Sequence, residues 1–278
     1  MEQLTFAVPA AWTQVETFGC ATLQFAHTQA SVAAYEKPLK GQVLTGTYAA
    51  ILEQAKAVGN ADCAILVFGN VGGENQFLKD LQEIISCPMV GGGAAFTEQP
   101  GLIPGKGQAA VFFVQDDRYR FETVTQCIHE DLVDTCTLTL ADPRTILQIN
   151  GRDAATYLKE KKAALGLPET DFEHLTLTDH LGVNAHLSWV DGVIKSGRDL
   201  EKTMTLRYVP HAVVYDRIRK FYDDENAIIF GCAGLGGLLD RPLGTNNLGL
   251  FLFGEVCTVG NTAEFGNLML SKLRILDK

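Results

Sequence analysis

The sequence contains seven cysteines but no CxxC pair. A zinc ribbon and a thioredoxin-type redox site both need closely spaced cysteines, so neither is encoded. Nothing in the chain matches the phosphate-binding pattern GxxxxGK[ST], the GxSxG turn of many hydrolases or the zinc-binding motif HExxH. These absences exclude the commonest nucleotide-binding, hydrolase and metalloprotease signatures, and we predict neither a metal nor a cofactor.

Long hydrophobic runs are also missing. No window approaches the roughly 18 apolar residues of a membrane-spanning helix, and the opening MEQLTF lacks the basic stretch of a signal peptide. Most cysteines lie inside apolar runs, where a thiol behaves as a small hydrophobic group, and this usage is typical of a reducing compartment. We therefore expect a soluble cytoplasmic protein.

Basic residues are scarce. The chain has 23 lysines and arginines against 33 acidic residues, a net charge of −10, so its surface repels phosphate backbones and anionic membranes. The densest basic group is Lys159, Lys161 and Lys162, which lacks interleaved aromatic residues and favours a solvated helix face. We expect neither nucleic acid nor a membrane as a partner.

Glycine, in contrast, is abundant, with 27 occurrences in 278 residues against a usual share of about 7%. The glycines separate helical and strand-like patterns that alternate along the chain. Apolar periodicity predicts helices over residues 44–58, 72–85, 153–165 and 212–222. Apolar runs and turn signals predict strands over residues 63–68, 109–115, 120–125, 135–140, 146–149, 227–230, 249–256 and 267–275, with a hairpin around Asp191 and Gly192.

This alternation predicts an α/β fold in which helices cover mixed β-sheets. Residues 62–73 and 226–237 echo each other, because each segment is an apolar strand followed by glycines. Duplication and the shared pattern of α/β proteins explain this echo equally well. We expect two similar, closely packed halves, residues 1–134 and 135–278, since the length corresponds to about two domains.

Two glycine clusters follow predicted strands, Gly91 to Gly93 and Gly231 to Gly237. The second cluster departs from GxGxxG, because Leu239 stands where the last glycine is needed, so tight turns or close packing explain these glycines better than a nucleotide phosphate does. His174, His180 and His186 are evenly spaced, but the segment crosses a probable turn. Surface or hydrogen-bonded histidines are favoured over metal ligands there.

Glu255 interrupts the apolar stretch GLFLFGEVC, where a carboxylate must be paired, exposed at a strand end or shifted in pKa. It could hold a ligand's ammonium group or act as a base, and a structural ion pair or an edge position explains it equally well. Cys232 ends a predicted buried strand. A loop could expose it as a nucleophile, although packing of the strand end is the favoured interpretation.

The C-terminal third resembles the FIST domain family. The resemblance is carried by a strand ending in Cys232, by the segment that closes with Gly254 and Glu255, and by Asn267 before the last strand. Residues 149–158 are similar to the start of the family's C-terminal half, and residues 62–68 and 89–95 resemble its N-terminal half.

This resemblance implies a sensory domain of a signalling system that binds a small ligand such as an amino acid. Because the two halves account for all 278 residues, we expect no attached output domain and a separate signalling protein as partner. We expect the ligand, a small polar metabolite, to lie between the halves. Its predicted contacts are Glu255 as anionic anchor, Asn267 as hydrogen-bonding neighbour, and Gly254, Cys232, Gly91, Gly92 and Gly93.

An enzyme is the alternative hypothesis. Cys232 or Cys257 would then be the nucleophile of an acyl-transfer or hydrolytic reaction, with Glu255 or a histidine as the base. A purely structural protein, with solid packing around Glu255, is a third possibility.

Overall fold

The computed structural model describes residues 4–6, 13–18, 21–26, 39–69, 72–93, 107–224, 227–239, 248–252 and 254–278. The predicted loop at residues 99–107 lies almost entirely outside this part of the chain. Near the N-terminus, β1 (Leu4–Phe6), β2 (Thr13–Phe18) and β3 (Ala21–Ala26) form a small sheet in the order β1-β3-β2.

A first repeat follows, in which two parallel strands are joined by a helix and flanked by antiparallel strands. It consists of β4 (Gly41–Thr47), α1 (Tyr48–Ala55), β5 (Cys63–Phe68), α2 (Glu74–Ile84), β6 (Met89–Gly93) and β7 (Gln108–Val114). Its strands lie in the order β6-β5-β7-β4, with β5 parallel to β6 and antiparallel to β7.

The second repeat has the same arrangement. It consists of β8 (Tyr119–Cys127), α4 (His211–Tyr222), β17 (Ala227–Cys232), α5 (Ala233–Gly237), β18 (Leu248–Leu252) and β21 (Met269–Asp277). Its strand order is β18-β17-β21-β8, with β17 parallel to β18 and antiparallel to β21. The strands within the two similar segments, residues 62–73 and 226–237, therefore occupy equivalent positions: β5 is the central parallel strand of the first repeat and β17 that of the second.

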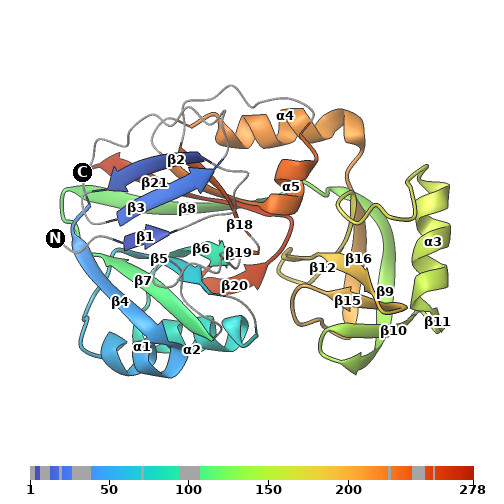
Figure 1. The fold of residues 1–278 in the computed structure, drawn as a ribbon, viewed down its shortest axis with the longest axis horizontal. Helices are drawn as coiled ribbons and strands as arrows, with labels where there is room; N and C mark the ends of the chain where they lie inside the picture. The colour runs from blue at the N-terminus through green and yellow to red at the C-terminus, as the bar shows by residue number, and fades with distance from the viewer. Residues whose placement is uncertain are drawn as a thin grey trace.

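The two repeats pack as four layers, with α1 and α2 on one outer face, α4 on the other and the sheets between them (Figure 1). Every residue of β5 and of β17 is buried, since each strand is covered on one face by helices and on the other by the opposite sheet. Hydrogen bonds cross between the sheets, for example from the Thr125 hydroxyl to the Thr258 carbonyl at 3.2 Å.

A further sheet is inserted between β8 and α4 and lies to the right of the sandwich in Figure 1. It consists of β9 (Asp131–Asp142), β10 (Thr145–Ile149), β11 (Arg152–Asp153), β12 (Leu175–Thr178), β13 (Asn184–Ala185), β14 (Leu187–Val190), β15 (Val193–Ser196) and β16 (Thr203–Tyr208). Helix α3 (Ala154–Ala164) covers one face of this inserted sheet. In the first repeat, β4 runs directly into α1.

The predicted α/β class with mixed sheets is confirmed. The expected boundary between residues 134 and 135 falls within β9, and β8 from the first expected half pairs with β21 from the second. Among the described residues, no helix is both long and apolar enough to cross a membrane.

Two predicted elements are wrong in detail. Residues 44–47 belong to β4 rather than to a helix, because this segment pairs with β7 and Thr47 caps α1. The predicted final strands are divided: β18 belongs to the sheet of the second repeat, whereas β19 (Glu255–Val259) and β20 (Thr262–Gly266) extend the sheet of the first. The chain changes sheets at Gly254, where φ is +88°.

Candidate functional site

The predicted glycine cluster Gly91 to Gly93 and the segment Gly254–Glu255 come together where β19 pairs with β6. Glu255 lies opposite Gly92, and Val256 lies opposite Gly91. The Gly93 N–H donates to the Gly254 carbonyl at 2.9 Å. Residues far apart in the sequence therefore meet at the join between the two repeats.

Two of these glycines are required by packing. A Cβ at Gly91 would lie 1.9 Å from the Leu66 carbonyl oxygen, so any side chain there would collide with β5. At Gly254 the backbone is left-handed, and a Cβ would lie 2.3 Å from the Phe265 ring. Because the Gly93 N–H already has an acceptor, this part of the cluster forms a close backbone contact and does not offer that donor to a ligand.

Glu255 is fully buried. Its Oε2 accepts the Met269 N–H at 3.1 Å, and the Cys232 thiol hydrogen-bonds to the carboxyl group. Burial raises the pKa of Glu255 well above its ordinary value, and these hydrogen bonds oppose the rise only in part. Desolvation therefore favours the neutral form of the side chain, and a carboxylate here would need a cationic partner. The role of Glu255 as an anionic anchor stays a prediction.

Cys232 and Cys257 are both buried beside Glu255. Burial is the largest cause that raises the pKa of each thiol, and Glu255 raises both further. A nucleophilic cysteine needs the opposite environment, which favours the thiolate. In the described part of the chain, neither thiol of the enzyme hypothesis is activated, and Cys232 packs at the strand end.

Asn267 lies in a second polar group, on the side of the inserted sheet. It is 8% exposed, and its N–H donates to the Asn184 carbonyl at 3.0 Å. Its side-chain amide lies between Gly197 and Gly254, and its Oδ1 is buried without a hydrogen-bond partner among the described residues. Within the described ranges no hydrogen bond joins this amide to the Glu255 carboxyl, so the predicted site residues form two adjoining groups.

Arg198, which the sequence did not single out, belongs to the second group. It is 4% exposed, with Nη1 2.9 Å from Asp179 Oδ2 and Nη2 3.5 Å from Glu264 Oε2. Its Nε is buried and has no partner within the described chain. The segment Ser-Gly-Arg-Asp carries no sequence signal of a buried arginine, because charged residues after a strand usually lie in a solvated loop.

The three evenly spaced histidines are hydrogen-bonded or exposed, as the sequence favoured. His174 Nδ1 lies 2.7 Å from Asp171 Oδ2, and His180 Nδ1 lies 2.6 Å from Glu201 Oε1. No group of three or more histidine, cysteine, aspartate or glutamate residues in the described ranges is placed to hold a metal ion.

The lysine group on α3 differs from the sequence expectation at one position. Lys162 is buried, donates to the Glu169 carbonyl and lies over the Phe172 ring, and burial lowers its pKa to about 8. The prediction of a wholly solvated face is therefore wrong there, because the lysine stem packs along apolar surface.

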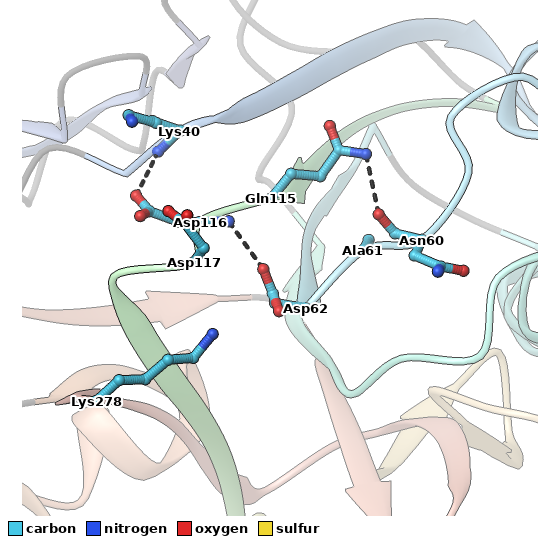
Figure 2. Close-up of a pocket in the computed structure, with 8 residues that line it drawn as sticks. All are labelled: Lys40, Asn60, Ala61, Asp62, Gln115, Asp116, Asp117 and Lys278. Carbon is cyan, nitrogen blue, oxygen red and sulfur yellow. Dashed lines mark hydrogen bonds between the residues drawn. The ribbon is translucent and has the colours of Figure 1, made fainter.

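Figure 2 shows a separate open cleft of about 490 Å³ at the amino end of β5. Asp62 and Asp116 are linked there, because the Asp116 N–H donates to Asp62 Oδ2 at 2.8 Å. The Arg118 guanidinium holds the pKa of Asp116 at about 2. The cleft lies at the opposite end of β5 from Phe68, whereas ligands of parallel α/β sheets bind beyond the carboxyl ends of the strands.

Comparison with protein-family models and with curated proteins finds no match for this chain. The FIST resemblance consequently stays a prediction that depends on the sequence motifs alone.

Proposed function

We propose that the protein is a FIST-type sensory protein that binds a small polar metabolite, such as an amino acid, at the junction of the two repeats and the inserted sheet. It acts in the cytoplasm and passes the signal to a separate protein. The observation that carries this proposal is a set of three buried polar atoms at this junction. None of them has a nitrogen or oxygen atom of the described residues as a hydrogen-bond partner: Glu255 Oε1, Asn267 Oδ1 and Arg198 Nε.

Unpaired buried polar groups are costly, at about 1–3 kcal/mol each, and a folded protein keeps few of them without a reason. A polar ligand that supplies the missing partners recovers this free energy when it binds. Glu255 and Asn267 lie on β19 and after β20, which extend the sheet of the first repeat, and Arg198 follows β15 of the inserted sheet. One ligand would therefore connect these two sheets. Such a connection suits a sensor, because occupancy would then bias how these parts pack.

The raised pKa of Glu255 shapes the expected binding. To pair with a ligand's ammonium group, the carboxyl must lose its proton, so binding releases a proton and tightens as the pH rises. At lower pH the neutral form is favoured and binding weakens.

Thermal-shift measurements with a panel of amino acids, small amines and small carboxylates test the proposal. We expect at least one amino acid or amine to raise the melting temperature of the wild-type protein, with a larger shift at higher pH. Glu255→Gln, which mimics the neutral carboxyl group, should fold but lose this response. Glu201→Gln, at a half-buried carboxylate paired with the exposed His180, is the matched control and should keep it.

A flat response of the wild-type protein across the panel would count against ligand binding. A Glu255→Gln variant that responds as the wild type does would remove Glu255 from the site.

A further inference from the structure

Arg198 presents its guanidinium group in an unusual way. A guanidinium offers one edge made of the two Nη atoms and another made of Nε and Nη2, and the second edge matches the two oxygens of a carboxylate. Arg198 uses Nη1 for Asp179 Oδ2 at 2.9 Å and for the Val183 carbonyl at 3.4 Å. These contacts fix the side chain in place.

The other edge is poorly occupied. Nε has no partner in the described part of the protein, and Nη2 has only Glu264 Oε2 at 3.5 Å, too long for a good charge-assisted hydrogen bond. A buried cation with a preformed but almost empty edge is a ready site for a planar oxyanion.

Glu264 covers this edge weakly. Its side chain is 24% exposed, whereas those of Arg198 and Asp179 are 5% and 1% exposed, so Glu264 can move into solvent while Arg198 stays anchored. Burial raises the pKa of Glu264, so its ionised form is disfavoured and its ion pair with the guanidinium is weakened further. The Asn267 side chain lies against both Gly197, the residue before Arg198, and Gly254, the residue before Glu255, which places the arginine near Glu255.

We propose that the Nε and Nη2 edge of Arg198 binds the carboxylate of a small ligand, which displaces Glu264, while Asn267 Oδ1 accepts a hydrogen bond from a hydroxyl or ammonium group on the neighbouring carbon. This inference rests on the proposed function and names the ligand class, small carboxylates that carry an adjacent hydrogen-bond donor. Arg198 is then the residue that selects the carboxylate.

Titration of the full-length, ¹⁵N-labelled protein with glycolate, glycine and acetate, and with the matched amides of the three, tests this assignment. The Nε–H resonance of Arg198, identified by its absence in Arg198→Lys, should shift with the carboxylates and stay in place with the amides. Glycolate and glycine should bind more tightly than acetate, because only they carry a donor for Asn267.

Two variants sharpen the test. Glu264→Gln removes the competing charge, and should tighten carboxylate binding about two- to fivefold, the size of one partly exposed charge interaction. Arg198→Lys should weaken it about tenfold or more, because an ammonium group does not present two coplanar N–H donors. Glu83→Gln, at an exposed position of α2, is the control for a change of net charge and should bind as the wild type does.

An unmoved Arg198 Nε–H resonance at saturating carboxylate, or a Glu264→Gln variant no tighter than wild type, would overturn the assignment even if Arg198→Lys fails to fold. A ligand that acts through Glu255 while this resonance stays in place would preserve the proposed function and refute only the carboxylate site. If no ligand shifts the Arg198 resonance and none acts through Glu255, both the carboxylate site and the proposed function are refuted.

Discussion

The central strands of the two repeats end in opposite chemical environments. In the first repeat, β5 ends in Phe68, whose ring makes edge-to-face contacts with Tyr48, Phe77 and Phe265 at centroid distances of 6.0, 5.9 and 5.7 Å. In the second, β17 ends in Cys232, whose thiol contacts the buried carboxyl group of Glu255. The same backbone arrangement thus surrounds an aromatic cluster in one repeat and a polar group in the other.

The two repeats share one backbone arrangement, but the aromatic cluster at Phe68 has a packing role, whereas the polar group at Cys232 and Glu255 is a candidate for a functional one. An aromatic cluster is stabilised by its own packing, whereas a buried carboxyl group costs free energy unless hydrogen bonds or an opposite charge compensate for the lost water. The second repeat also carries the inserted sheet, which supplies Arg198, and the first repeat has no counterpart to it. The candidate site residues therefore come from three sheets: Cys232 from the second repeat, Glu255 from β19 in the sheet of the first, and Arg198 from the inserted sheet.

The largest expected effect is at Phe68. Phe68→Ala should lower the free energy of unfolding by about 3–5 kcal/mol, because it leaves a cavity among three other rings. Urea unfolding measures this loss. Cys232→Ala, at the matched strand end, removes a single sulfur atom and should cost about 1 kcal/mol. Equal losses in the two variants would show that both strand ends have the same packing role.

Glu255 should make stability depend on pH in a way that the first repeat does not. Its pKa is raised in the folded protein, so its neutral form is favoured there, while the unfolded chain ionises above about pH 4.3. Stability is consequently lost as the pH rises above the pKa of the unfolded chain, until the folded carboxyl group ionises as well.

Glu255→Gln should remove this loss, so the variant gains stability over the wild type as the pH rises. Urea unfolding at a series of pH values checks the prediction, with Glu201→Gln as the control. A stability difference between Glu255→Gln and the wild type that is constant with pH would mean that Glu255 is ionised when folded.

His129 should produce the opposite pH dependence where the second repeat joins the inserted sheet. Its Nε2–H donates to the Glu173 carbonyl at 2.7 Å, and burial lowers its pKa from 6.5 to about 4. The unfolded chain therefore takes up a proton that the folded protein excludes, and stability falls as the pH drops below about 6.5, by about 2 kcal/mol at pH 5.

His129→Gln should lack this acid-side loss, as unfolding at pH 7 and pH 5 would show. His180→Gln, at an exposed histidine, is the control and should leave the loss in place. An acid-side loss that survives in His129→Gln would assign it to the carboxylates of the inserted sheet.

The sequence predicted the parts of this fold that depend on local patterns. The continuous apolar run of β5, the turn at Asp191 and the end of α3 before Gly166 all follow from side-chain periodicity and backbone preferences. The proximity of Gly92 and Glu255 also agrees with the predicted set of site residues.

What the sequence did not predict depends on tertiary contacts. The change of sheet at Gly254 follows from the pairing of β19 with β6, and the burial of Arg198 follows from how the inserted sheet packs on β20. Neither leaves a periodic signal. The raised pKa of Glu255 follows from its burial, and the apolar stretch around it in the sequence left three interpretations of this residue open.

The smallest expected effect concerns how each repeat begins its first helix. In the first repeat, Thr47 caps α1, because its hydroxyl accepts the Ala50 N–H at 3.3 Å, whereas α4 of the second repeat follows Pro210, which offers no side-chain acceptor. Thr47→Ala should therefore cost about 1 kcal/mol in urea unfolding. Thr45→Ala, an exposed threonine of the same strand, is the control and should cost less. If the two variants are equally stable, the pairing of β4 with β7 fixes where α1 begins, and the cap contributes nothing to the difference between the repeats.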